Sequence, residues 1–110
     1  MNTTLAVTRL AALAQETRLA LFRLLVQKGP DGMCAGDLQT RLKTAPATLS
    51  FHLKELSRAG LIKSRQDGRF IYYSPNFKSM NSLLSYLTDN CCGGEPCDVA
   101  CAPRRSANAA

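Results

Sequence analysis

Cysteines are the residues of this chain most able to do chemistry, and four of the five fall between residues 91 and 101. Cys91 and Cys92 are adjacent, and Cys97 and Cys101 follow. Two glycines and a proline lie between the pair and Cys97. They favour a tight reversal, so Cys97 can reach the pair at a small entropic cost of loop closure. Three thiolates without an imidazole suit a soft, thiophilic ligand.

The chemistry of this cluster leaves several interpretations open. Trivalent arsenic takes three sulfurs, which Cys91, Cys92 and Cys97 would supply. Zinc, cadmium or lead would use a fourth ligand, which Cys101 could provide. Adjacent thiols could instead sense oxidants, or the cluster could only staple the C-terminal segment. A thiol enzyme such as an arsenate reductase is not indicated, because no Cys-x-x-Cys, phosphate-cradling loop or nearby histidine would activate a cysteine.

Composition predicts one small domain with an anionic partner. The chain has 110 residues, and 45% of them are apolar, which is enough for a compact core. No apolar run approaches the ~20 residues of a membrane span. The N-terminal stretch is interrupted by Arg9 and makes a poor signal peptide. We therefore expect a cytoplasmic protein with no membrane contact. The net charge of +6 points toward a polyanion such as nucleic acid.

Hydrophobic periodicity predicts the elements that must position these residues. Helices are expected over residues 5–13, 17–27, 36–42, 46–59 and 77–88, with strands over 61–65 and 69–74 around an Asp-Gly turn. Two helices joined by a short turn and followed by a hairpin are typical of a winged helix-turn-helix. The predicted fold is mainly α with a β-hairpin. We divide the chain into a DNA-binding and dimerisation domain (1–90), a cysteine-rich inducer-binding segment (91–101) and a disordered tail (102–110).

The helix over 46–59 is the expected recognition helix. Its buried stripe is Leu49, Leu53 and Leu56, and seven basic residues against two acidic ones lie between residues 41 and 69. This excess is what phosphate contacts require. Phe51 is expected either to contact a thymine methyl or to pack under the hairpin, and His52 to pack or to contact a phosphate. The predicted DNA-contacting residues are Ala47, Thr48, Ser50, Phe51, His52, Lys54 and Arg58 on the helix and Arg65 and Arg69 on the hairpin.

The first and last helices predict a dimer. Their apolar stripes, over 5–13 and 77–88, exceed what a small helical core can cover. A two-fold dimer would bind double-stranded operator DNA with half-sites about one helical turn, roughly 10–11 base pairs, apart.

Several segments, in order, resemble the ArsR/SmtB family of metal-responsive repressors. They are ALAQETRL (12–19), GDL (36–38), TLSFHLKEL (48–56), AGLI (59–62) and, as the wing, RQDGRFIYY (65–73). The match covers roughly residues 10–90. The resemblance implies a non-enzymatic repressor that forms a homodimer through its first and last helices. It also implies that ligand binding releases the protein from the operator of a resistance operon.

The effector site departs from the family's founding pattern. Many arsenic-responsive members carry a Cys-x-Cys-x-x-Cys box before the turn, where this chain has Cys34, Gly36 and Gln39. Cys34 is therefore expected to be a small buried hydrophobe. Residues 77–88 also lack the Asp and His of zinc-sensing members. The cluster after them resembles instead an arsenite-sensing subset with a vicinal cysteine pair. We predict a repressor that needs no cofactor and takes As(III) as inducer, or Sb(III) or methylated As(III).

Overall fold

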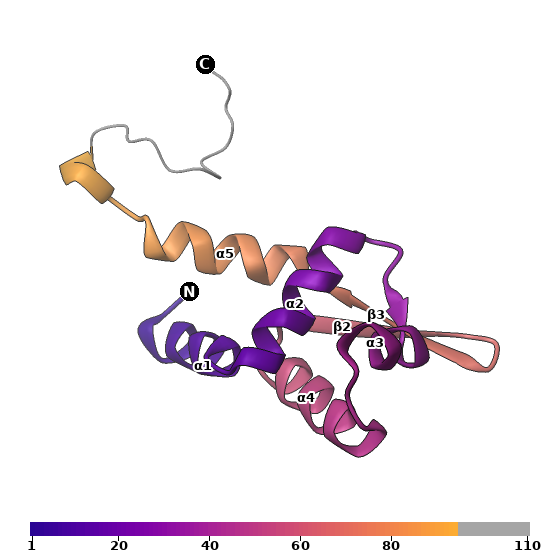
Figure 1. Ribbon diagram of the computed structural model, residues 1–110. Helices are drawn as coiled ribbons and strands as arrows, with labels where there is room; N and C mark the ends of the chain where they lie inside the picture. Colours follow the sequence, from indigo (N-terminus) through magenta and orange to yellow (C-terminus); the bar gives the residue numbers. More distant parts are fainter. Residues whose placement is uncertain (95–110) are drawn as a thin grey trace.

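The computed structural model describes residues 1–94, and it shows the winged helix-turn-helix predicted from the sequence. Helices α1 and α5 lie side by side, and the hairpin of β2 and β3, the wing, projects beyond the helices at the other end (Figure 1). The predictions for Cys97, Cys101 and the tail fall outside the described residues. The elements are α1 (Thr3–Leu13), α2 (Glu16–Lys28), β1 (Met33–Cys34), α3 (Ala35–Leu42), α4 (Pro46–Arg58), β2 (Ile62–Asp67), β3 (Phe70–Pro75), α5 (Phe77–Leu87) and a 3-10 turn (Cys91–Gly94).

The core lies between α2, α3, α4 and the base of the wing. Its fully buried side chains include Leu21, Leu25, Leu38 and Leu56. Each buried leucine stabilises the fold by about 1.5–3 kcal/mol through the removal of apolar surface from water. The predicted stripe on α4 is confirmed, because all three of its leucines are buried.

The capping residues show what holds the start of a helix, and at α1 they explain why the helix begins earlier than predicted. The Asn2 side chain accepts a hydrogen bond from the Leu5 backbone N–H at 2.8 Å, so α1 begins at Thr3 rather than at residue 5. At α4, Pro46 occupies the first turn, and the capping position is Ala45, which has no side-chain bond to offer. Thr44 does not serve in its place, because its hydroxyl donates to the Leu42 carbonyl. Packing of the leucine stripe, rather than a cap, therefore holds the start of α4.

The sheet has three strands in the order β1-β3-β2, whereas the sequence predicted only the hairpin. In the additional strand, Met33 pairs with Tyr73 and Cys34 with Tyr72. A strand of two residues is too short to show an alternating pattern, which is why the sequence did not reveal it. Gly32 makes the approach possible: its φ is +77°, and a Cβ there would lie 2.4 Å from the Tyr73 carbonyl oxygen. The turn after α2 is thereby held against the wing.

The Arg9 side chain and one hydroxyl pair connect α1 to α4 and α5. Arg9 Nε donates to the Ala59 carbonyl at the end of α4, at 3.1 Å. The Thr3 and Tyr86 hydroxyls hydrogen-bond each other between α1 and α5. Helix α1 thus contacts both the last helix and the end of α4. None of the helices in residues 1–94 is long and apolar enough to cross a bilayer.

Candidate nucleic-acid interface

Helix α4 presents small, hydroxyl and basic side chains on the side opposite its leucines. This arrangement suits a DNA groove, since small residues allow close approach and hydroxyl and basic groups bond to bases and phosphates. The predicted residues that the structure exposes on this face are Ala47, Thr48, Ser50, Phe51, Lys54 and Arg58.

Phe51 is the one aromatic residue predicted for this face, and it is 54% exposed. Its ring stands edge-on to the His52 ring, with centroids 5.4 Å apart and an interplanar angle of 62°. An edge-on partner fixes the ring direction while the rest of the ring stays open to solvent. The exposure favours contact with a thymine methyl over packing beneath the wing.

His52 is the exception in the predicted set, because only 7% of it is exposed. Its Nδ1 lies 3.4 Å from Arg18 Nη1. A guanidinium only donates, so the neutral imidazole accepts here through Nδ1. Burial lowers the pKa of His52 below its ordinary value of 6.5, and the Arg18 charge lowers it further, while Glu55 acts in the opposite direction. His52 therefore packs α4 against α2 and is not placed to reach a phosphate.

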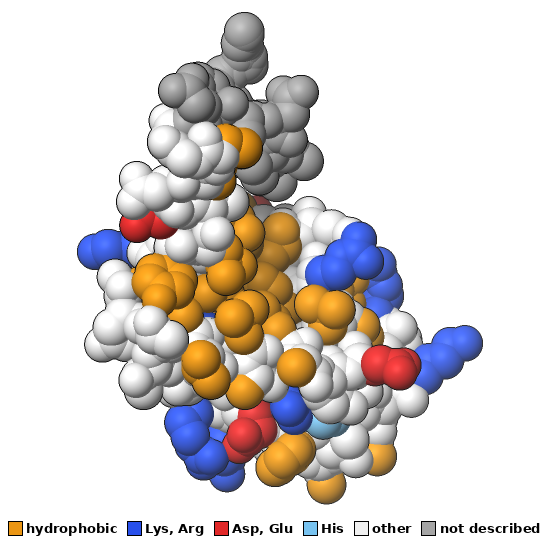
Figure 2. All heavy atoms as spheres, turned by 90° about the vertical axis from the view of Figure 1, so that its left-hand side faces the viewer, with side chains coloured by type: hydrophobic (Ala, Val, Ile, Leu, Met, Phe, Trp, Pro, Cys, Tyr) orange, Lys and Arg blue, Asp and Glu red, His pale blue; other side chains and the backbone are white. Residues whose placement is uncertain are grey.

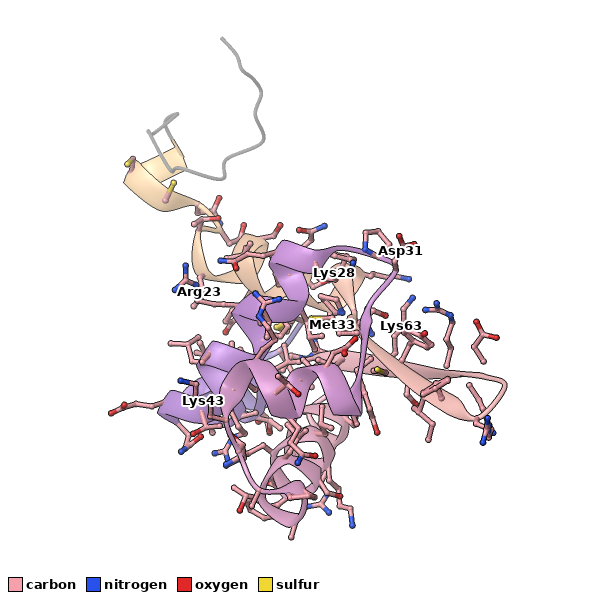
Figure 3. All side chains as sticks on the ribbon, turned by 45° about the vertical axis from the view of Figure 1, so that its right-hand side comes forward. Arg23, Lys28, Asp31, Met33, Lys43 and Lys63 are labelled. Carbon is pink, nitrogen blue, oxygen red and sulfur yellow. The ribbon has the colours of Figure 1, made fainter. Side chains whose placement is uncertain are left out.

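The two wing arginines differ in their surroundings. Arg65 donates from Nη1 to the Asp31 carbonyl at 3.0 Å, and its guanidinium lies 4.9 Å from the centre of the Tyr72 ring. Asp31 belongs to the turn after α2, beside the base of the wing (Figure 3). Arg69, at the tip, has no hydrogen bond or ion pair within residues 1–94. Arg65 thus holds the wing to the turn, whereas Arg69 is available to a partner.

The basic residues on and around α4 and the wing form what we call the basic face. Most of them have no acidic partner within residues 1–94. In the described part of the chain the only ion pair joins Arg58 Nη1 to Glu55 Oε2, at 2.9 Å. An exposed pair of this kind contributes little to stability and leaves the arginine accessible. The remaining basic residues on and around α4 and the wing therefore create the positive potential that attracts phosphates. They are Arg41, Lys43, Lys54, Lys63, Arg65 and Arg69.

The vicinal cysteines lie just beyond α5, in the 3-10 turn. Cys91 is half-buried and Cys92 is exposed. Cys92, Gly93 and Gly94 all have positive φ, and the predicted return of the chain toward Cys97 falls outside the described residues. Within residues 1–94 no three His, Cys, Asp or Glu side chains gather as a metal site, and the candidate third and fourth sulfurs lie outside that range. Cys34 is half-buried rather than buried, and it stands alone at the start of α3.

A second surface, the terminal-helix face, is apolar. We define it by the exposed residues Leu5 and Leu10 of α1 and Leu84 and Leu87 of α5. Figure 2 shows hydrophobic side chains running across this side of the molecule. Exposed patches of this kind on soluble proteins mark interaction surfaces.

The fold and the basic face of α4 define a winged helix-turn-helix regulator of transcription. The profile of a family described as a helix-turn-helix domain matches residues 13–65. The arsenical resistance operon repressor of Bacillus subtilis is 37% identical over 81 residues, which is 74% of this chain and 73% of that protein. The chain belongs to the ArsR/SmtB family of DNA-binding transcriptional regulators, whose members are not enzymes.

Other relatives show how varied the family's responses are. The cadmium resistance transcriptional regulatory protein CadC of Listeria innocua is 34% identical over 72 residues, covering 64% of this chain and 59% of that protein. Among solved structures, HlyU from Vibrio cholerae is 33% identical with a TM-score of 0.63, covering 78% of this chain and 94% of that one. The relatives are thus named for arsenical resistance, for cadmium resistance and, in the case of HlyU, as a transcriptional activator.

Proposed function

We propose that this protein is an arsenic-responsive repressor that leaves its operator when As(III) binds cysteine thiolates. The observation that carries the proposal is the Cys91–Cys92 pair at the end of α5, followed by two glycines in left-handed conformation. Glycines in this conformation are compatible with a tight turn, and in the proposed complex a third sulfur from Cys97 or Cys101 joins the pair. Arsenite would exchange its three hydroxyl groups for three sulfurs and release three water molecules, and Sb(III) or methylated As(III) offers related chemistry.

In the proposed complex, α4 lies in the major groove of the operator. Thr48 and Ser50 reach base edges, and Ala47 and Phe51 contact thymine methyl groups. Lys54 and Arg58 bind phosphates from α4, and Arg65 and Arg69 do so from the wing. The exposure of all eight side chains supports this assignment, and His52 is left out because it is buried.

The protein acts as a homodimer in this proposal. The terminal-helix face is apolar, and Figure 1 shows α1 and α5 at one end of the molecule with the wing projecting at the other. Burying it against the same face of a second copy satisfies two-fold symmetry, because each patch then meets its own equivalent. Such a dimer would present two copies of α4 to two half-sites of one operator.

The inducer site and α4 communicate through α1. The cysteine pair directly follows α5, and Tyr86 on α5 hydrogen-bonds Thr3 on α1. Further along, α1 is bonded through Arg9 to the Ala59 carbonyl, just after α4. Drawing the sulfurs together around arsenic would pull on the end of α5 and shift α1 with it. The spacing of the two α4 helices would then no longer fit the operator, which is the differential binding that release requires.

The deciding experiment measures release from a DNA duplex selected by the wild-type protein from a random library. Cys91→Ser and Cys92→Ser should each keep DNA affinity and lose release by arsenite, because a serine hydroxyl does not replace a thiolate on a soft centre. Cys34→Ser is the matched control and should respond like wild type. Mass spectrometry should find one arsenic per chain. A Cys91→Ser/Cys92→Ser double variant that still leaves DNA at the wild-type arsenite concentration would contradict the proposal.

A second candidate is a repressor that responds to cadmium, zinc or lead through four cysteines. The similarity to CadC and the presence of Cys101 favour it. Release by cadmium but not by arsenite, lost in Cys101→Ser, would select this function. Release by hydrogen peroxide without added metal would select a thiol redox sensor instead.

A further inference from the structure

The Arg18 side chain is bonded to two helices besides its own, a role that the proposed DNA contacts do not use. Arg18 lies at the start of α2, where the Gln15 side chain accepts a hydrogen bond from its backbone N–H at 2.9 Å. Its Nε donates to the Ala12 carbonyl in the last turn of α1, at 2.6 Å. Its Nη1 lies 3.4 Å from His52 Nδ1 on α4. One guanidinium therefore joins α1, α2 and α4 where these helices meet (Figure 1).

Both acceptors of Arg18 suit a guanidinium. The Ala12 carbonyl is among the last four of α1, which have no backbone donor within their own helix, and a positive charge is favourable at this end of the helix dipole. His52 is buried, so water does not readily replace Arg18 as the donor to its Nδ1. The donors of a planar guanidinium point in fixed directions. Arg18 therefore fixes the distance between the end of α1 and the middle of α4.

A second arginine holds α4 to α1 further along the chain. Arg9 Nε donates to the Ala59 carbonyl, which directly follows the last residue of α4. Ala59 comes about two helical turns after His52, roughly 10 Å along the axis. A helix held at one point can pivot about it, whereas a helix held at two points along its length keeps its direction. Arg9 and Arg18 together therefore fix how α4 points relative to α1.

We propose that Arg18 is a positioning residue that sets which spacing of operator half-sites the protein prefers. The inference rests on the proposed homodimer, in which α1 belongs to the shared face and α4 enters the major groove. In such a dimer the position of α4 relative to α1 also determines its position relative to the α4 of the second copy. One base pair added between the half-sites moves a half-site by about 3.4 Å and turns it by about 35° around the duplex axis. A dimer whose α4 helices are held by Arg18 therefore binds well only to the matching spacing.

The test compares a duplex selected by the wild-type protein with duplexes that carry one base pair more or one fewer between the half-sites. Wild type should bind the altered spacings about tenfold less tightly, because the second α4 no longer meets its half-site well. Arg18→Lys keeps the charge, but a compact ammonium does not bond both acceptors. It should reduce the difference to about threefold or less, mainly by weakening binding to the selected spacing. Affinity for a duplex with a single half-site should stay that of wild type, because Arg18 does not contact DNA.

Three further variants separate positioning from a general loss of stability. Arg18→Gln, which is shorter and neutral, should act in the same direction as Arg18→Lys. Arg23→Lys is the matched control and should keep the wild-type preference, since Arg23 is exposed on the same helix and has no hydrogen bond or ion pair within residues 1–94. His52→Asn should also keep the preference, because the amide oxygen still accepts from Arg18. Circular dichroism and sedimentation identify the variants that are folded and dimeric.

Two results would overturn the proposal. In the first, wild type discriminates between the spacings, and a folded, dimeric Arg18→Lys or Arg18→Gln protein discriminates equally well. The proposed dimer would then stand, and only the role of Arg18 would be lost. In the second, wild type binds all spacings with the same affinity. The arrangement of two α4 helices on two half-sites would then fail, and the role of Arg18 would fail with it.

Discussion

Two surfaces of this molecule are built in opposite ways. One is the exposed side of α4 together with the wing, and the other is the terminal-helix face. The first carries hydroxyl and basic groups over a buried leucine stripe, and the second leaves leucines exposed on α1 and α5. A surface that binds a hydrated polyanion stays open to solvent until the partner arrives. A surface that binds its own copy can be apolar, since it is covered as soon as two chains meet. The contrast agrees with the proposed division between DNA contact and self-association, which can be tested one surface at a time.

Breaking the terminal-helix face should have the largest effect. Leu84→Lys with Leu87→Lys places two charges on each copy of the proposed interface, where desolvation and repulsion oppose association. We expect monomers at micromolar concentration and a loss of operator affinity of about 100-fold or more, because one half-site no longer assists the other. Sedimentation and binding assays measure both. Leu19→Lys is the control, and a double variant that remains dimeric would contradict the proposed interface.

Removing a base contact on α4 should have the next largest effect. Ser50→Ala deletes a hydroxyl placed to reach a base edge while leaving the buried side of α4 intact. The gap in binding free energy between operator and random DNA should shrink by about 1–3 kcal/mol. Competition binding with selected and scrambled duplexes measures the gap. An equal loss of affinity for both duplexes would show that Ser50 contacts only the backbone.

The hydrogen bond between α1 and α5 is open to a subtler change. Tyr86→Phe removes the hydroxyl that bonds Thr3 and leaves the ring in place. A single hydrogen bond contributes about 0.5–1.5 kcal/mol, so severalfold more arsenite should be needed to release DNA, with arsenite affinity in the absence of DNA unchanged. Thr3→Val should give the same result, and the double variant no more than either single change. Additive effects would show that the two hydroxyls act separately.

Removing the charge of Arg69 should weaken DNA binding by a few fold and make the affinity less dependent on salt. Arg69→Ala removes one proposed phosphate contact, so the slope of log affinity against log salt should flatten by about 0.9 on every sequence. Arg65→Ala should lower affinity further, because the wing also loses its bond to the Asp31 carbonyl. Titrations at several salt concentrations compare the two. Identical losses would mean that the Asp31 bond does not orient the wing.

His52 should give the smallest effect, on stability rather than on binding. Its pKa is lowered in the folded state, so the unfolded chain binds the proton more readily. The contribution of His52 to stability is therefore present above about pH 6.5, the pKa of the exposed group, and is lost as the pH falls through the lower folded value. Urea unfolding at pH 7.5 and 5 measures this. His52→Asn should show a smaller change, because the amide oxygen still accepts from Arg18 and no proton is taken up.

The sequence predicted the elements with strong periodic patterns and missed those held by contacts distant in the chain. The leucines of α4 and the Asp-Gly turn of the wing carry local signals, and both were confirmed. Strand β1 has no such signal, because it exists only through its pairing with Tyr72 and Tyr73. The same holds for the bond between Arg65 and Asp31, which are 34 residues apart. The cysteine cluster was visible from spacing, but the choice of third sulfur depends on residues beyond 94.

Strand β1 also determines how firmly each part of the wing is held. At Tyr72 and Tyr73, β3 has hydrogen-bonded neighbours on both edges, whereas closer to Phe70 it has only β2. The hairpin is therefore held by hydrogen bonds on both edges of β3 at its base and on one edge only near its tip. We expect the tip to bend more than the base, on the nanosecond-to-microsecond scale of loop motions. In the proposed operator complex, this freedom would let the tip adjust to the duplex while the base keeps its orientation relative to α4.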